Sequence, residues 1–261
     1  MLDLAGKNVW ITGASSGLGA ALAQQCLDAG ARVLLSARRV ERLQEVARGR
    51  ANVALLPLDL AALDTLADKT AEALQAMGSI DVMIHNAGVG QRALVSESSF
   101  AVDRHLMDVN FLGPVALTKA LLPSMLTQKS GHFVVISSVL GLMSMKRRAG
   151  YCASKHALHG YFNALRAEVH QDGLRVLLVC PGHIDSEFSQ AALSADGRAN
   201  GVNEAHSRAG LSPEECARTT LRALRRGSAE VYPAKWESVG VYLNRYAPGL
   251  MRRAVASMKA R

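Results

Sequence analysis

Short apolar runs rich in β-branched residues alternate with helical patterns of apolar positions along most of the chain. Such runs predict strands, because β-branched side chains pack well on a pleated surface. The predicted strands are 7–12, 31–36, 53–58, 80–85, 131–137, 174–180 and 229–232, and helical patterns begin near 17, 40, 62, 99, 151 and 213. This alternation predicts an α/β fold, with parallel strands joined by right-handed crossovers. We expect a single doubly wound domain over residues 1–261, with a seven-stranded parallel sheet and helices on both faces.

The composition agrees with one globular domain that buries a large core. The chain has 261 residues, of which 49% are hydrophobic and 20% are charged. Charge or glycine interrupts the apolar runs well short of the ~18 residues of a membrane-spanning helix, and no secretory signal is visible. We therefore expect a cytoplasmic protein that is soluble or peripheral to a membrane.

The cysteine spacing argues against a metal-binding protein, and the lack of known motifs argues against a nucleic-acid-binding protein. Four scattered cysteines without CxxC spacing are expected to be free thiols, and the sequence predicts no metal site. A net charge of +8 attracts polyanions in general. However, no helix-turn-helix, zinc-finger or RNA-binding pattern accompanies it, so no specific nucleic-acid partner is expected.

A glycine-rich turn follows the first predicted strand. The run KNVWIT leads into GASSGLG and then into a helical pattern, which is the strand, turn and helix of a dinucleotide-binding (Rossmann) unit. Gly13 permits the tight turn, Gly17 lets the backbone approach a diphosphate, and Gly19 lets the helix pack close to the strand. A helix N-terminus then faces the phosphates.

The end of the second strand, RVLLSARR, bears on cofactor choice. An NAD site usually places an acid there to bind the adenosine ribose, but this chain has Ala37. Arg38 and Arg39 follow, and guanidinium groups suit bidentate recognition of a phosphate. The alternative is that two exposed arginines merely begin a helix. The missing acid favours NADP(H).

Tyr151 and Lys155 lie four positions apart and therefore share a helix face, and Ser138 ends the apolar run HFVVISS. A free tyrosine ionises near pH 10, and a neighbouring cation is expected to lower that pKa. The serine hydroxyl can bind the same substrate oxygen. The tyrosine–lysine spacing alone also fits a half-buried helix tyrosine and a solvated lysine without a catalytic role. Other motifs in the chain are therefore needed to distinguish the two interpretations.

In its order and spacing of motifs the chain resembles the short-chain dehydrogenase/reductase family from about residue 5 to residue 190. The motifs are TGASSGLG, HNAG at 85–88, VN at 109–110, the serine, tyrosine and lysine above, and CPG at 180–182. One departure is His85, where the family more often has asparagine.

The resemblance implies the roles of the site residues. Ser138, Tyr151 and Lys155 would be catalytic, with Lys155 also holding the nicotinamide ribose, and Asn110 would hold a water that links Lys155 to solvent. Asp59 would lie beside the adenine ring. The implied cofactor-binding residues are Gly13, Ser15, Ser16, Gly17, Leu18, Gly19, Arg38, Arg39, Asp59, Leu60, Asn86, Ala87, Gly88, Tyr151, Lys155, Pro181, Gly182 and Ile184.

These residues predict an NADP(H)-dependent oxidoreductase that interconverts a carbonyl and a secondary alcohol by hydride transfer. Tyr151 would give the proton in the reductive direction while Ser138 binds the same oxygen. A non-catalytic NADP(H)-binding sensor is the alternative, because dinucleotide folds are reused for binding. A sensor would not need Ser138, Tyr151 and Lys155 together.

Two segments are expected to determine substrate specificity. Residues 183–211, rich in Gly, Ala, Ser and Asn, predict a lid. Residues 235–261 form a basic amphipathic extension that suits packing on the enzyme, a subunit partner or an anionic membrane surface. Apolar residues in the lid, in the extension and after Ser138 predict an apolar or lipid-like substrate; those near the opening are Leu142, Met143, Phe188 and Leu193.

Two stretches of the second half, SVGVYLNRYAPGLM and ASKHALHGYFNALRAEV, are similar to lipid-handling reductases of the acyl/alkyl-dihydroxyacetone-phosphate reductase kind. This narrower likeness implies a lipid ketone reductase at a membrane surface.

Assembly is expected from two helices that are apolar on most sides. The run FLGPVALTKALLPSML and the helix from Tyr151 to about Gln171 need cover beyond one sheet face. In the family these helices form a two-fold contact, which implies a homodimer or homotetramer.

Overall fold

The computed structural model describes residues 2–201 and 210–257, so parts of the expected lid (183–211) and extension (235–261) lie outside the described residues. Within them, each predicted strand is present within about two residues of its expected bounds. The strands are β1 (Asn8–Thr12), β2 (Arg32–Ala37), β3 (Val53–Pro57), β4 (Val82–His85), β5 (Gly131–Ile136), β6 (Leu174–Val179) and β7 (Glu230–Val231).

The strands form one sheet in the order β3-β2-β1-β4-β5-β6-β7. Every neighbouring pair is parallel. The chain moves outward from β1 to β3 and then returns to place β4 on the other side of β1. This reversal is the switch point at which doubly wound sheets bind ligands, outside the carboxyl ends of the strands. The α/β doubly wound prediction is confirmed.

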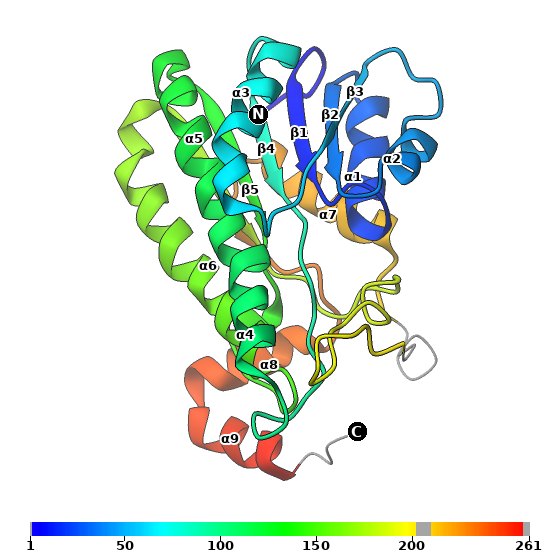
Figure 1. The fold of residues 1–261 in the computed structure, drawn as a ribbon. Coiled ribbons are helices and arrows are strands. Elements are labelled where there is room, and N and C mark those ends of the chain that lie inside the picture. The colour runs from blue at the N-terminus through cyan, green and yellow to red at the C-terminus, as the bar shows by residue number, and fades with distance from the viewer. Residues whose placement is uncertain (1, 202–209, 258–261) are drawn as a thin grey trace.

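Helices cover both faces of the sheet (Figure 1). The helices are α1 (Gly17–Asp28), α2 (Val40–Ala47), α3 (Leu66–Met77), α4 (Phe100–Met107), α5 (Gly113–Gln128), α6 (Ala149–Glu168), α7 (Pro213–Arg225), α8 (Glu237–Tyr246) and α9 (Pro248–Ser257). Short helical turns occur at Leu63–Thr65, Val139–Gly141 and His170–Asp172, and a π-helical turn at Asp108–Leu112 joins α4 to α5.

Each face of the sheet has its own apolar core. On one face, side chains of α1, α2 and α7 pack with alternate residues of the strands, such as Val9 and Ile11. On the other face, α3, α5 and α6 pack around Trp10, Phe133 and Phe162, all fully buried. Alternation along β1 therefore sends successive side chains to opposite cores, which explains why its whole run is apolar.

A third apolar cluster joins the C-terminal helices to the body of the protein. Val241 of α8 and Met251 of α9 pack with Met143 and with Tyr151. Asn244 donates a hydrogen bond of 2.9 Å to the carbonyl oxygen of Leu142. The inner side of the extension is thus part of the enzyme fold, beneath the carboxyl ends of the strands (Figure 1).

His85, the departure from the family motif, is a core residue. Its ring stacks on Phe133 with centroids 6.2 Å apart, and its Nε2 lies 2.8 Å from the Thr118 hydroxyl. Burial lowers the pKa of His85 to about 3, because the charged imidazolium would lose its hydration. The ring is therefore neutral at physiological pH and packs as a large apolar group.

The continuous helical stretch Phe100–Gln128 is long and apolar enough to cross a membrane by length and composition. The sequence analysis expected no membrane-spanning helix, because charge or glycine interrupts the apolar runs. Leu117, Leu121 and Met125 of this stretch are fully buried in the core of the enzyme. Its apolar composition is therefore explained in part by packing on the sheet.

Candidate active site

A cavity of about 1120 Å³ opens at the carboxyl ends of the strands. All the residues expected to bind the cofactor line it, together with Ser138; the set is Gly13, Ser15, Ser16, Gly17, Leu18, Gly19, Arg38, Arg39, Asp59, Leu60, Asn86, Ala87, Gly88, Tyr151, Lys155, Pro181, Gly182 and Ile184. Asn110, expected to be catalytic, is absent from this lining. The fold thus brings residues from six strand ends into one continuous site.

The glycine turn is shaped by close backbone contacts. Gly13 has φ of +65°, and a side chain on Gly19 would place its Cβ 2.2 Å from the carbonyl oxygen of Gly13. The amide of Asn86 donates to the carbonyl oxygens of Thr12 and Gly13, at 2.9 and 3.1 Å. The Thr12 hydroxyl accepts from the backbone N–H groups of Asn86 and Ala87. Asn86 therefore fixes the turn after β1 to the end of β4.

The N-terminus of α1 faces the cavity. Ser16 is the N-cap residue, and its side chain makes no capping hydrogen bond to the helix. Ser15, Ser16 and Gly17 line the cavity beside it. The first N–H groups of this helix and the two hydroxyls can therefore serve an anionic ligand.

The two arginines after β2 lie where the sequence placed them. Arg38 and Arg39 are exposed, and both line the cavity at the far side of the glycine turn from Tyr151. Ala37 ends β2, so no carboxylate stands at the position that would bind ribose hydroxyls. Asp59 is exposed at the same end, and its carboxylate accepts from the backbone N–H of Ala61.

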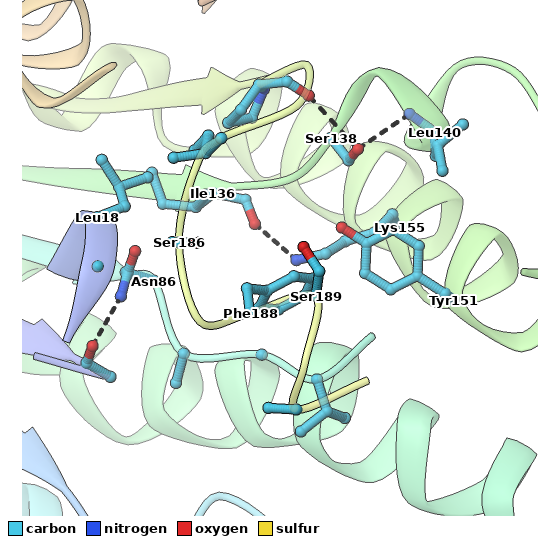
Figure 2. A pocket seen from close by; sticks show the side chains of 18 of the residues that line it. Leu18, Asn86, Ile136, Ser138, Leu140, Tyr151, Lys155, Ser186, Phe188 and Ser189 are labelled. Carbon is cyan, nitrogen blue, oxygen red and sulfur yellow. Dashed lines mark hydrogen bonds between the residues drawn. The ribbon is translucent and has the colours of Figure 1, made fainter. Parts of the chain in front are cut away.

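Tyr151 and Lys155 project from α6 into the same part of the cavity, and Ser138 lies beside Tyr151 (Figure 2). The Nζ of Lys155 lies 5.8 Å from the centre of the Tyr151 ring. The Ser138 hydroxyl accepts from the backbone N–H of Leu140, at 3.1 Å, and lies 3.5 Å from the carbonyl oxygen of Pro181. The predicted trio is thus assembled on one face of the cavity.

The proton affinity of Tyr151 differs from the expectation. Burial raises the pKa of Tyr151 to about 12, and a hydrogen bond with Ser138 and the charge of Arg148 oppose that rise. The expected lowering of the Tyr151 pKa is therefore not found in this structure, because desolvation outweighs the groups that oppose it.

Lys155 is itself strongly affected by burial. Its side chain is 4% exposed, and its Nζ donates a hydrogen bond of 2.8 Å to the carbonyl oxygen of Ile136. Desolvation lowers the pKa of Lys155 to about 8. A buried cation with a single carbonyl partner is costly, and this pattern is typical of functional sites.

Asn110 lies one layer behind the cavity, in the π-helical turn between α4 and α5. Its side chain accepts from the backbone N–H of Val89 at 2.8 Å and donates to the Val89 carbonyl at 2.9 Å. It also donates to the Ser154 hydroxyl at 3.0 Å. The structure therefore shows Asn110 as a residue that positions the strand end, and π-turns are frequent at functional sites.

Sequence reasoning missed Gln91, which is buried and links the site to α6. Its side-chain oxygen accepts from the backbone N–H of Gly150 at 2.8 Å and from that of Tyr151 at 3.3 Å. Its side-chain nitrogen donates to Asp103 at 3.0 Å. Gln91 thereby caps the start of α6. No local pattern could reveal this, because the partners are about sixty positions apart.

A second group missed from sequence is a cluster of three arginines in the cavity wall next to Tyr151. Arg92, Arg147 and Arg148 all line the cavity. The backbone N–H of Ala93 donates to the carbonyl of Arg147 at 3.1 Å, which holds the two segments together. Desolvation first, then the charges of Arg148 and Arg147, lower the pKa of Arg92. Three guanidinium groups therefore stand close together in this wall of the cavity.

The described part of residues 183–211, the expected lid, packs beside Tyr151 and Gln91. The Phe188 ring lies 6.1 Å from the Tyr151 ring, and Gln91 forms a β-bridge with Leu193. Phe188, Leu193 and Met143 line the cavity as expected. Leu142 does not; it packs in the cluster beneath α8. From the extension, the cavity wall takes Trp236, Glu237, Gly240, Met251 and Val255.

Behind Lys155, Cys180 meets two groups that are distant in sequence. Its Sγ lies 3.6 Å from Nε2 of His159 and 3.5 Å from a carboxylate oxygen of Glu230. Burial, Glu230 and a hydrogen bond to Glu230 raise the pKa of the Cys180 thiol. These three residues could hold a metal ion by proximity, which cysteine spacing alone did not predict. As they stand, the protonated thiol is a hydrogen-bond donor to the carboxylate.

Known proteins share both the sequence and this architecture. Residues 7–197 match the family described as short chain dehydrogenase. Dehydrogenase/reductase SDR family member 7B of Bos taurus is 42% identical over 260 residues, covering 95% of this chain and 80% of its own.

Two crystal structures superpose over nearly the whole chain. A short chain dehydrogenase from Burkholderia cenocepacia, in complex with NADP, has a TM-score of 0.84 and 25% identity, covering 98% of this chain and 100% of its own. A short chain dehydrogenase/reductase from Burkholderia phymatum, in complex with NAD, has a TM-score of 0.83 and 24% identity, covering 96% of each chain. The second likeness concerns the fold alone.

Proposed function

We propose that this chain, which belongs to the short-chain dehydrogenase family of oxidoreductases, uses NADP(H) to interconvert a carbonyl and a secondary alcohol. The observation that carries the cofactor choice is the end of β2, where Ala37 replaces an acid and Arg38 and Arg39 line the cavity. Guanidinium groups favour a ribose phosphate over ribose hydroxyls. The Burkholderia cenocepacia structure contains NADP, which supports this choice.

The site fits a dinucleotide on independent grounds. The backbone at Gly13 and Gly19 approaches too closely for any side chain, which leaves room for a diphosphate over the N-terminus of α1. The cavity of about 1120 Å³ extends from Arg38 to Tyr151 and can hold both a dinucleotide and a substrate. When bound, NADPH supplies the hydride from its nicotinamide ring.

The protein's own residues supply the proton and bind the carbonyl oxygen. With its pKa near 12, Tyr151 is protonated at neutral pH and can donate to the oxygen of a carbonyl that is being reduced. The Ser138 hydroxyl hydrogen-bonds the same oxygen and stabilises its developing negative charge. Arg148 lowers the proton affinity of the phenol and so helps the transfer. Lys155 places a buried ammonium group beside Tyr151.

We further propose that the substrate combines an apolar body with an anionic group. Met143, Phe188 and Met251 supply an apolar wall, whereas Arg92, Arg147 and Arg148 gather positive charge at the same end of the cavity. Within the described residues, the buried Nε of Arg147 has no hydrogen-bond partner. Like charges held together are stabilised by a bound anion, and arginines bind carboxylates and phosphates well.

The experiment follows NADPH absorbance with matched ketones that carry a neutral ester, a carboxylate or a phosphate monoester on the same alkyl chain. The proposal expects turnover with NADPH and a preference of at least about ten-fold for an anionic member.

The variant Arg147→Asn tests the anionic subsite. Asparagine tolerates the left-handed backbone at this position (φ of +64°), and the substitution should abolish the preference for anionic ketones. Arg42→Gln, on exposed α2, is the matched charge control. Equal rates for neutral and anionic ketones would exclude the anionic subsite and leave the oxidoreductase assignment intact.

Chain length tests the apolar wall separately. Each added methylene should raise kcat/KM up to a few-fold until the cavity is full, because its burial contributes about 0.8 kcal/mol. A series without any trend would exclude a lipid-like substrate.

A non-catalytic sensor is the rival function. It is disfavoured by the assembly of Ser138, Tyr151 and Lys155 on one cavity face, since cofactor binding alone does not need all three. NADPH binding without turnover of any carbonyl in the series would reverse this choice.

A further inference from the structure

The outer side of the C-terminal helices carries an apolar surface that is exposed among the residues the structure describes. Val239, Tyr242 and Tyr246 of α8 are 64%, 55% and 77% exposed, and Leu250 of α9 is 58% exposed. Trp236, at the start of α8, is also exposed. We call these five residues the α8–α9 outer face. Exposed apolar side chains are ordinary when scattered, but here they are concentrated within fifteen positions.

The helix α8 is apolar on two opposite sides. Val241 is buried against Met143, and Asn244 binds the Leu142 carbonyl, so this side faces the enzyme. Val239, Tyr242 and Tyr246 recur at helical spacing on the other side. One side is explained by the fold. The other requires a cover that the described chain does not supply.

The charges around the outer face are nearly all positive. Arg245, Arg252 and Arg253 are exposed on the same two helices. The one carboxylate of α8 and α9, Glu237, turns inward and accepts from the backbone N–H groups of His183 and Lys235. Aromatic and aliphatic side chains beside arginines complement a membrane surface with anionic headgroups.

The outer face also borders the cavity. Gly240, Met251 and Val255 of the same two helices line the cavity, and Trp236 of the outer face lines it as well. In Figure 1, α8 and α9 project beneath the body of the protein, at the end opposite the N-terminal edge of the sheet. A surface that contacted α8 and α9 would therefore lie beside the substrate opening.

We infer that the α8–α9 outer face binds the surface of an anionic lipid bilayer, with its aromatic residues at the headgroup level and its arginines against the phosphates. The helices lie in the interface and do not span it. This orientation would present the cavity to a lipid-like substrate; that consequence rests on the proposed function, but bilayer binding itself does not.

The test uses the full chain and sedimentation with vesicles of phosphatidylcholine alone or mixed with phosphatidylglycerol. We expect binding to the mixed vesicles, at least about ten-fold weaker binding to phosphatidylcholine alone, and release at high salt. Tyr246→Ser with Leu250→Ser should lower binding at least about ten-fold, through lost apolar burial. Val95→Ser with Phe100→Ser removes two equally exposed apolar residues elsewhere and should leave binding unchanged.

Tryptophan emission gives a second readout that needs neither substrate nor cofactor. The chain has two tryptophans, and Trp10 is fully buried in the core. Trp236 should therefore account for any blue shift on adding mixed vesicles, and Trp236→Phe should abolish it. Because every substituted residue is exposed, thermal melting should be unchanged, and a lowered melting temperature would be seen directly.

Two results would overturn the inference. One is equal sedimentation of the unmodified chain and the Tyr246→Ser, Leu250→Ser variant. The other is self-association, measured by light scattering without vesicles, that is lost in this variant; it would assign the outer face to a second copy of the chain. Failure of vesicle binding would leave carbonyl reduction untouched, whereas a lack of turnover would leave vesicle binding untouched, so the two proposals are separable.

Discussion

The ammonium of Lys155 donates a 2.8 Å hydrogen bond to the carbonyl oxygen of Ile136, at the end of β5. The contact ties the catalytic helix to the strand that delivers Ser138, and it holds a cation in a nearly dry site. Burial lowers the pKa of Lys155 to about 8. The charge of the site therefore changes just above neutral pH, while Tyr151 stays protonated.

The pH dependence of carbonyl reduction should follow Lys155. Below about pH 8 the ammonium is charged and the rate should be constant; above it, kcat/KM should fall about ten-fold per pH unit as the charge is lost. Tyr151, with a pKa near 12, cannot cause this fall. A pH–rate profile that stays flat to about pH 10 would contradict the assignment.

The same burial predicts that Lys155 destabilises the fold. Its pKa is lower in the folded protein than its ordinary 10.5, so protonation favours the unfolded chain. The resulting loss of folding stability is fully present below about pH 8 and disappears as pH rises through 10.5. Lys155→Met should raise the free energy of unfolding at pH 7 by about 1–2 kcal/mol while abolishing turnover. Denaturant unfolding at two pH values measures this, and equal or lower stability at pH 7 would oppose it.

Tyr151→Phe should remove turnover and leave NADPH binding nearly unchanged, because only the hydroxyl that donates the proton is lost. Its ring still packs in the cluster with Met143, so melting temperature should change little. Fluorescence titration of NADPH and steady-state rates provide the two readouts. Appreciable turnover by the purified variant would require a different acid.

Ala37→Asp together with Arg38→Ile should shift coenzyme preference towards NADH. A charged hydrogen bond is worth roughly 1.5–3 kcal/mol, so the ratio of kcat/KM values should move by about ten- to a hundred-fold. Both positions line the cavity away from Tyr151, so the chemical step itself should be unaffected. Equal affinity of the unmodified chain for NADP and NAD would refute the choice of cofactor.

We propose that α5 and α6 form a two-fold contact between subunits, and light scattering should find at least a homodimer at micromolar concentration. Leu112 is 38% exposed at the start of α5, and the partly buried rings of Phe111 and Tyr161 meet edge to face next to it. Leu112→Glu should give monomers by placing a charge in the apolar contact. Val95→Glu is the exposed control. A monomeric unmodified chain would exclude this interface.

The order of the elements was readable from the sequence because parallel strands buried on both faces leave continuous apolar runs. β1 is such a strand, with Trp10 in one core and Val9 and Ile11 in the other. The glycine turn was equally predictable, since Gly13 and Gly19 occupy positions that no side chain fits. Helices α8 and α9 were anticipated only as an amphipathic extension, because mixed short patterns do not define where a helix begins.

The motifs also predicted Ser138, Tyr151, Lys155 and Arg38 as site residues, and the fold brings all four into one cavity. Tertiary structure decided the rest. Gln91 binds Tyr151, Ala93 binds Arg147, and Cys180 binds Glu230 only because distant segments converge at the carboxyl edge of the sheet. The pKa values of Tyr151 and Lys155 depend on burial, which is a property of packing and not of spacing. The sequence determined which groups are present, and the fold determined how far each of them is buried away from water.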